Sequence, residues 1–263
     1  MRDNLRRYRA IRAALTQGYP GQPTGTVARH VTTLAALISG IVGRERTHLP
    51  QLAMKVPDGT QAESRGKRVA RWARNDRITE EVYCVPYAQV LLAQLALHTL
   101  GLIMDGSAVG RGCVALRMPG VYKGRALPVA WQVRTGKKGH CPEALPIALV
   151  KQVQPLLPLG ASVVVLGEGE FDGTTLQHTL QDVHWFYVVR TGSTITGRWD
   201  GERFRCATVA ACIKPGTLVA LTDVHVTEAA YGPVMLLGCW AKGYQEPLHL
   251  LTNLASADAA CRL

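Results

Sequence analysis

The stretch "VVVLGEGEFDG", residues 163–173, ends an apolar run with three acidic residues in five positions. The apolar residues before it predict a buried strand, and the Gly-flanked acids mark the point where that strand stops. The acids are Glu168, Glu170 and Asp172. Of these, Asp172 is best explained as a turn or helix-cap residue, because it directly precedes a predicted helix.

A second apolar strand ends in the same way, since Asp105 follows Leu102–Met104 as Glu168 follows the valines. If the two strands are neighbours in one sheet, both carboxylates project from adjacent strand ends. They repel each other unless a cation lies between them. Mg²⁺ or Mn²⁺ suits this place, because one or two carboxylates leave room for phosphate oxygens. Two such ions about 4 Å apart can drive phosphodiester cleavage. A turn-forming role for Asp105 stays open.

The order of the predicted elements gives the fold class. Strands and helices are expected in the order β-β-β-α-β-α-β, at 101–109, 112–122, 126–136, 142–157, 161–169, 174–183 and 185–192. Three hairpin-linked strands followed by helix-linked strands predict an α/β fold with a mixed sheet in the ribonuclease H-like order. A β-rich extension is expected over about 192–245. The apolar segment 247–254 is expected to be exposed.

The N-terminal part, residues 1–98, reads as a separate, basic, all-helical domain. Helical spacing of apolar residues covers 4–15, 26–42, 63–75 and 87–100. Residues 1–100 hold fifteen Lys/Arg against seven Asp/Glu, so they carry +8 of the net charge of +11. This asymmetry predicts a polyanionic partner such as DNA. The candidate DNA-binding cations on the third of these helices are Arg65, Lys67, Arg68, Arg71 and Arg74, with Val69 and Trp72 as its anchors. A solvated helix face is the open alternative.

Other features limit the function classes. The seven cysteines lack CxxC spacing, so reduced thiols are expected and a metal site at His140 and Cys141 is a minor alternative. The sequence contains no GxSxG, Walker A or HExxH motif. Lys137 and Lys138 follow a strand and either contact phosphate or form a solvated loop. His184, His225 and His249 are expected in strands as surface or core residues. Without a signal peptide or a long uninterrupted apolar run, a soluble cytoplasmic protein is expected.

Three segments, residues 39–72, 103–133 and 163–177, together resemble DDE transposases of insertion sequences of the IS4 type. The resemblance implies a ribonuclease H-like core over 99–263 and an Asp-Asp-Glu triad that binds two Mg²⁺ ions. It also implies a β-rich insertion between the second and third acids, and an N-terminal helical region that binds element ends. Asp105 matches the first catalytic Asp, and Glu168 stands where the family has its second Asp. No residue matches the third acid, so a C-terminally truncated copy is expected.

The sequence therefore predicts a transposase that cleaves and joins DNA strands with Mg²⁺ or Mn²⁺, in a weakly active or inactive form. The predicted partners are double-stranded element ends and target DNA; no membrane is expected, and a homodimer is left open. The alternative is a catalytically dead DNA-binding remnant that occupies element ends. A nucleotide-binding enzyme is a distant third, because the glycines Gly167, Gly169 and Gly173 do not have GxGxxG spacing.

Overall fold

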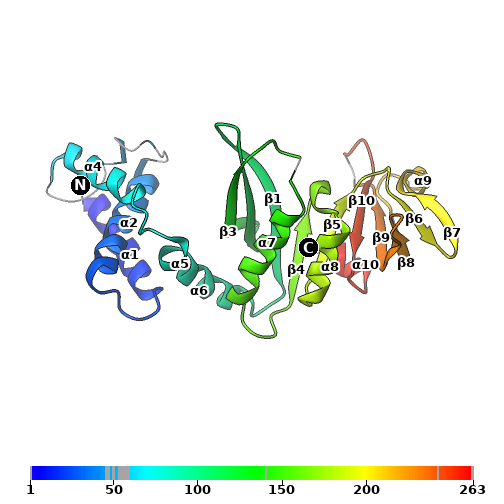
Figure 1. Cartoon of the computed structure of the whole chain (residues 1–263), viewed down its shortest axis with the longest axis horizontal. Coiled ribbons are helices and arrows are strands. Elements are labelled where there is room, and N and C mark those ends of the chain that lie inside the picture. Colours follow the sequence, from blue (N-terminus) through cyan, green and yellow to red (C-terminus); the bar gives the residue numbers. More distant parts are fainter. Residues whose placement is uncertain are drawn as a thin grey trace. The chain divides into compact units, whose positions relative to one another are not determined.

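Figure 1 shows the computed structural model of the chain, which describes residues 2–44, 48, 51–52, 60–139, 141–241 and 243–261. The chain forms two compact units, Met1–Leu91 and Leu92–Leu263. The division falls within helix α6 (Val85–Leu95), shortly before the expected boundary at residues 98–99. Each unit buries its own set of apolar side chains.

The described part of the first unit is helical. Its elements are α1 (Arg2–Gln17), α2 (Gly25–Arg44), α4 (Ala62–Ala73), α5 (Glu80–Tyr83) and the start of α6. Helix α2 packs against both α1 and α4. The sequence prediction of a helical segment is therefore confirmed, although the last predicted helix ends at Leu95 rather than at residue 100.

Helix α4 is held by its apolar side, as the sequence predicted. Val69 is completely buried, and the half-buried Trp72 ring packs edge-on to Tyr83 at 6.4 Å between ring centroids. Tyr83 is tied in turn to α2, because its hydroxyl lies 2.6 Å from Nδ1 of His30. These contacts fix which side of α4 faces the unit and which side faces solvent.

The described residues contain one helical segment that is long and apolar enough to cross a membrane, judged by length and composition only. It is Gly25–Gly43 within α2, with a mean hydropathy of 1.3, and 28% of it is buried in the unit.

The second unit is built on a mixed sheet whose first strands follow the predicted order. An antiparallel meander of three strands is followed by two helix–strand pairs. In chain order these elements are β1 (Leu100–Gly110), β2 (Cys113–Tyr122), β3 (Arg125–Thr135), α7 (Ala144–Val153), β4 (Val163–Gly167), α8 (Thr174–Asp182) and β5 (Phe186–Thr191). Strand β4 runs parallel to both β1 and β5. The valines of β4 are buried throughout, as expected for a parallel strand inside a sheet. A mixed α/β fold is thus confirmed.

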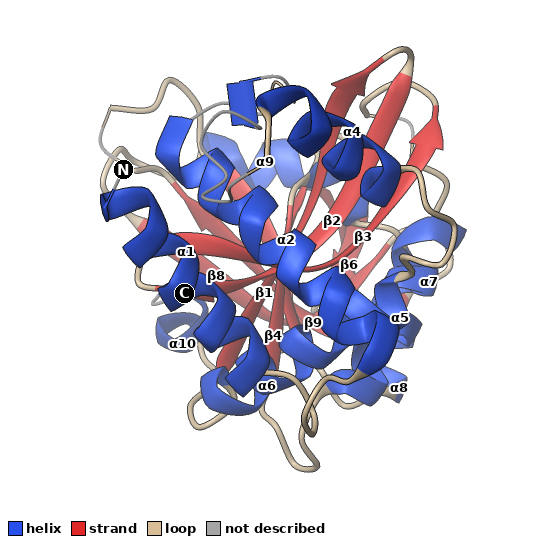
Figure 2. Cartoon of the chain, turned by 90° about the vertical axis from the view of Figure 1, so that its left-hand side faces the viewer, coloured by secondary structure: helices blue, strands red, loops and turns tan. Residues whose placement is uncertain are grey.

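The β-rich extension continues the same sheet instead of forming a separate one. It consists of β6 (Thr196–Trp199), β7 (Glu202–Arg205), α9 (Cys206–Ala211), β8 (Leu218–Val226), β9 (Tyr231–Cys239), β10 (Leu248–Thr252) and α10 (Ala257–Cys261). The described strands form one ten-stranded sheet in the order β3-β2-β1-β4-β5-β10-β9-β8-β6-β7. The strands fan out as they twist, which Figure 2 shows in red.

The apolar segment 247–254 is not exposed, and that expectation is wrong. Its strand β10 is a central strand, hydrogen-bonded antiparallel to β5 on one side and to β9 on the other. Leu251 is 2% exposed, and Leu250 and Leu254 pack with Ala260 of α10 against one buried cluster. Both faces of β10 are covered, because Leu250 packs against this cluster while Leu251, on the opposite face, is also buried, and this explains the apolar run.

Candidate functional site

The two predicted metal-binding acids lie next to each other in the sheet. The last register pair between the parallel strands β1 and β4 is Met104 with Gly167. Asp105 and Glu168 are the next residues along the chain, so their backbones are about one strand spacing, roughly 4.8 Å, apart. Glu168 directly follows β4, as expected, but β1 continues to Gly110, so the expectation that Asp105 stands at a strand end is wrong. Side chains alternate along a strand, and both carboxylates therefore belong to the face of the sheet that carries Leu166.

A tight turn presents Glu168 at the strand end. A Cβ atom on Gly167 would lie 3.2 Å from Cβ of Phe171 and 3.3 Å from Cγ1 of Val189. Phe171 is 1% exposed and closes the single 3₁₀ turn Gly169–Phe171 beneath the strand end. Glu168 itself is extended and exposed. The glycine thus lets the chain turn inward immediately after a solvent-facing carboxylate.

Asp105 is held by positive charge. Arg117 stands opposite it in the β1–β2 register and donates from Nη2 to Asp105 Oδ2 at 2.5 Å. Ser107 Oγ donates to the same oxygen at 3.0 Å and accepts from Arg117 Nη2 at 2.7 Å. Partial burial acts to raise the pKa of Asp105, but these hydrogen bonds and the charges of Arg117 and Lys138 outweigh it and hold the pKa below its usual range. Asp105 is therefore a carboxylate at neutral pH.

Glu168 also has a cationic neighbour. The last register pair between β4 and β5 is Gly167 with Val189, so Arg190 is the residue beside Glu168 on the same face. Glu168 and Arg190 are both exposed, and both line a hollow of about 740 Å³ at this end of the sheet. A side chain on β5 therefore reaches the same space as the acid on β4.

Together these residues form a charge row across four adjacent strands: Arg117 on β2, Asp105 on β1, Glu168 on β4 and Arg190 on β5. The two acids in the middle were predicted from the sequence, and the two arginines were missed. A signal for them exists, because each arginine interrupts an otherwise apolar strand segment. What the sequence lacks is the register that places them beside the acids.

The side chains of the three acids in residues 163–173, Glu168, Glu170 and Asp172, have different surroundings. Asp172 does not cap α8; its Oδ2 accepts from Thr191 Oγ1 of β5 at 2.8 Å, and burial raises its pKa. The start of α8 is capped instead from a distance, because Oε1 of Glu143 accepts from the backbone N–H of Leu176 at 2.7 Å. Predicting Asp172 as a turn residue is correct in position, since it directly follows the 3₁₀ turn, and predicting it as a cap is wrong.

Glu170 lies on the opposite face of the sheet from the acid pair. Gly106 follows Asp105 on β1, so it faces the opposite side of the sheet. A Cβ atom on Gly106 would lie 2.6 Å from Glu170 Oε1, which places Glu170 on that side. Glu170 Oε2 accepts from the backbone N–H of Gly139 at 3.0 Å and so ties down the loop after β3. Lys137 and Lys138 are exposed on this loop. The structure therefore brings the charge of Lys138 near the acid pair, as noted above for the aspartate.

The three histidines expected in strands differ in setting. His184 lies between α8 and β5 with φ of 59°, so its strand assignment is wrong, whereas His225 lies in β8. His249 in β10 is 5% exposed and lines the same hollow as the second acid. Burial lowers its pKa, against a hydrogen bond to the backbone of Cys206 that raises it, and the charge of Arg190 lowers it further. His249 is therefore a neutral core histidine.

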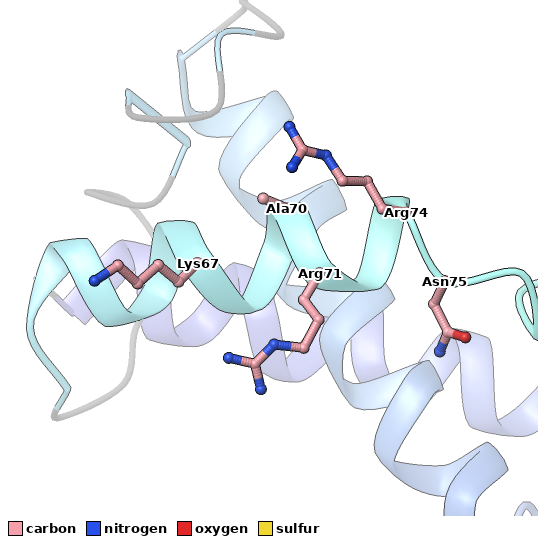
Figure 3. A pocket seen from close by; sticks show the side chains of 5 residues that line it. All are labelled: Lys67, Ala70, Arg71, Arg74 and Asn75. Carbon is pink, nitrogen blue, oxygen red and sulfur yellow. The ribbon is translucent and has the colours of Figure 1, made fainter.

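Three of the predicted DNA-binding cations share one solvent-facing part of α4. Lys67, Arg71 and Arg74 are exposed and follow one another at helical spacing of four and three residues. With Ala70 and Asn75 they line an open hollow of about 670 Å³ (Figure 3). No acidic side chain lines this hollow among the described residues. The hollow is suited to a phosphate group.

The other two predicted cations of α4 are placed differently. Arg65 and Arg68 are half-buried, so they belong partly to the packing of the unit. Lys67 is exposed but forms an ion pair with Glu63 one turn earlier, at 2.7 Å. Such an exposed pair is weak and does not prevent Lys67 from binding another anion.

The chemistry of the acid pair fits a hard divalent cation. Both hydrogen bonds that Asp105 accepts from described residues end on Oδ2, which leaves Oδ1 for a further ligand. Within the described ranges, no group of three or more His, Cys, Asp or Glu side chains could hold a metal. A metal ion at this place would therefore have only Asp105 and Glu168 as side-chain ligands among the described residues, and water or phosphate oxygens would complete its coordination. The alternative ligand His140 lies outside the described residues, and Cys141 is an unpaired thiol.

Comparison with known proteins gives only distant similarity. The chain matches no family model and no curated protein. Among solved structures it is similar to the piggyBac transposase synaptic complex with hairpin DNA, with 12% identity and a TM-score of 0.49 over 96% of this chain and 58% of that one. It is also similar to human endonuclease V, with 17% identity and a TM-score of 0.33 over 62% of this chain and 74% of that one. The chain thus spans less than two thirds of the length of the transposase.

Proposed function

We propose that this protein is a DNA-acting transposase-type protein with a ribonuclease H-like core, in which Asp105 and Glu168 hold Mg²⁺ or Mn²⁺. The observation that carries the proposal is the placement of these two acids side by side across the parallel pair β1 and β4, with Asp105 inside β1 and Glu168 directly after β4. The strand order β3-β2-β1-β4-β5, with an antiparallel meander and parallel crossovers, supports the ribonuclease H-like assignment. The finer assignment to the IS4 type rests on the motifs in residues 103–133 and 163–177.

In this proposal each residue has a defined task. Asp105 and Glu168 would hold the ion, which would supply Lewis-acid activation of a phosphodiester and of the oxygen that attacks it. Ser107 fixes the orientation of Asp105 through a hydrogen bond to Oδ2. The exposed cations of α4 bind the DNA backbone. The protein works in the cytoplasm, and a homodimer on paired DNA ends is compatible with this role.

A second function, DNA binding without cleavage, is favoured by one specific observation. Arg117 already neutralises Asp105, and the described residues offer no third carboxylate beside the pair. Under this alternative the chain occupies DNA through Lys67, Arg71 and Arg74 and binds no catalytic ion. The two functions differ in whether the acid pair takes up a divalent cation.

The first experiment measures Mn²⁺ binding to the whole chain by isothermal titration calorimetry. Asp105→Asn and Glu168→Gln should each weaken binding about tenfold or more, because each removes one of the two ligands. Asp182→Asn, at an exposed position at the end of α8, is the matched control and should bind as the parent does. Equal binding by all four proteins would show that the acid pair is not the metal site.

The second experiment measures the salt dependence of duplex DNA binding by fluorescence anisotropy. Replacing Lys67, Arg71 and Arg74 by Ala should reduce the slope of log K against log[salt] by about 2.7, since each phosphate contact contributes about 0.9. The control removes three exposed cations from strand turns, Arg111, Lys123 and Arg125. An unchanged slope in the α4 variant would exclude α4 as the DNA contact.

A further inference from the structure

We propose that Arg117 and Arg190 form a phosphate-binding pair that flanks the two acids, and that nucleic-acid phosphate draws Arg117 away from Asp105. This inference rests on the proposed function and adds two residues and a coupling to it. The ligand is a phosphodiester strand that crosses β2, β1, β4 and β5 at the level of the acid pair. Metal and phosphate then reinforce each other's binding.

The position of the arginines follows from the strand register. Arg117 is paired with Asp105, and Arg190 follows the last pair of β4 with β5, so one arginine stands on each side of the acid pair. The Cα atoms of the two arginines are three strand spacings apart, roughly 14 Å. A strand that crosses the acid pair therefore meets an arginine before and after it.

Charge counting supports a phosphate ligand. Two arginines and two carboxylates sum to zero, so the row is neutral by itself. A divalent cation between the acids would leave the row with a charge of +2. Two phosphodiester groups, each with one negative charge, restore neutrality, and the arginine fork is the side chain best suited to bind them.

The present partners of the arginines are weak enough to be exchanged. The side chains of Arg117 and Asp105 are 47% and 31% exposed, and exposed ion pairs contribute little free energy. Arg190 is exposed on the rim of the hollow that also contains Glu168. The same hollow is lined by the hydroxyl groups of Ser193 and Thr194, which are ordinary donors to phosphate oxygens, and also by the carboxyl groups of Asp172 and Glu246.

Arg117 therefore has opposite effects in two conditions. Without nucleic acid it competes with the metal for Asp105, so its removal should tighten Mn²⁺ binding. With nucleic acid bound it holds a phosphate next to the metal, so its removal should weaken Mn²⁺ binding. A residue with a merely structural role would shift both measurements in the same direction.

The test is Mn²⁺ titration of the full chain, with and without a saturating oligonucleotide duplex. For Arg117→Ala we expect binding about twofold to fivefold tighter than the parent without DNA. With DNA we expect it at least about fivefold weaker, the lower end of ordinary coupling between sites. Arg117→Lys, which keeps the charge, should show smaller shifts of the same signs. Arg125→Ala, at the β2–β3 turn, should change neither measurement.

DNA binding in EDTA separates this inference from the proposed function. Arg117→Ala and Arg190→Ala should each lower duplex affinity when no metal is present, whereas Arg125→Ala should not. If they do so while no protein binds Mn²⁺, the metal site fails and the phosphate pair stands. If Asp105→Asn abolishes Mn²⁺ binding but the arginine variants bind DNA as the parent does, the phosphate pair is overturned. Effects of the same sign for Arg117→Ala in both titrations overturn the coupling.

Discussion

The first turn of α8, which follows the turn that carries Glu168, depends on a capping hydrogen bond from Glu143, 33 residues before Leu176 in the chain. Glu143 Oε1 accepts from the N–H of Leu176 at 2.7 Å and so satisfies the first turn of α8. The N-cap residue is Gly173, which has no side chain to do this. A Cβ atom on Gly173 would lie 2.2 Å from Glu143 Oε1, so Gly173→Ala must expel the carboxylate. The two substitutions should therefore remove the same hydrogen bond.

The expected magnitudes follow from that shared bond. Glu143→Ala should cost about 1 to 2 kcal/mol, the loss of a capping bond made by a half-buried carboxylate. Gly173→Ala should cost about the same in the parent protein. In the Glu143→Ala background, Gly173→Ala should be close to neutral, because two effects of similar size oppose each other. Replacing a glycine with φ of −64° lowers the conformational entropy of the unfolded chain and so stabilises the protein, whereas alanine is a poorer N-cap residue than glycine. The coupling energy should then be about 1 to 2 kcal/mol.

Urea unfolding of the four proteins of this double-mutant cycle, followed by circular dichroism, measures the coupling. Hydrogen exchange at the Leu176 amide gives a local readout, and its protection should fall in both single variants. Glu143→Gln is the matched control, since it keeps an acceptor oxygen and should cost less than Glu143→Ala. Additive effects within about 0.5 kcal/mol would refute the shared cap. So would a Gly173→Ala variant as stable as the parent.

Three further predictions follow from burial. Cys206 is fully buried, and burial raises its pKa to about 11, whereas Cys212 is exposed. A thiol reagent at pH 8 should therefore label Cys212 first and Cys206 only on unfolding, which peptide mass spectrometry would detect. Leu251→Ala should destabilise the second unit by about 2 to 5 kcal/mol in urea titrations, whereas the fully exposed Leu159→Ala should change stability by less than about 0.5 kcal/mol. Folding lowers the pKa of His249, so the unfolded chain binds more protons than the folded one below about pH 6.5. The free energy of unfolding should therefore fall from pH 7 to pH 5, and it should fall less in His249→Asn. Equal slopes of this free energy against pH in the two proteins would contradict the prediction.

The core of the fold was predictable because local patterns were sufficient for it. Alternating burial along β1 and continuous burial of β4 match the alternation and the apolar run in the sequence. Strand β10 was not recognised, because its partners β5 and β9 are far apart in the chain and nothing local indicates pairing on both edges. An apolar segment between turns has the same composition whether it is a central strand or an exposed surface.

The candidate site was predictable only in part. Asp105 and Glu168 could be found because each ends an apolar run. Arg117 could not be paired with Asp105 from the sequence, since a shift of one residue in the β1–β2 register would turn Arg117 to the opposite face. Charged residues inside apolar strands are nevertheless a usable signal. In this chain Arg117 and Arg190 are two strand arginines that each lie beside an acid.

The three acids can stand close together at the end of β4 because their side chains point in different directions. Glu168 lies on one face, beside the acid of β1; Glu170 lies on the other face and binds the loop after β3; Asp172 binds β5. This divergence reduces their mutual repulsion, although Glu168 and Asp172 both line the hollow at this end of the sheet. The two that bind protein groups fix the turn on which the exposed Glu168 stands. A residue that is to bind a metal with only one protein partner needs such a rigid base, because its geometry cannot rely on a third ligand.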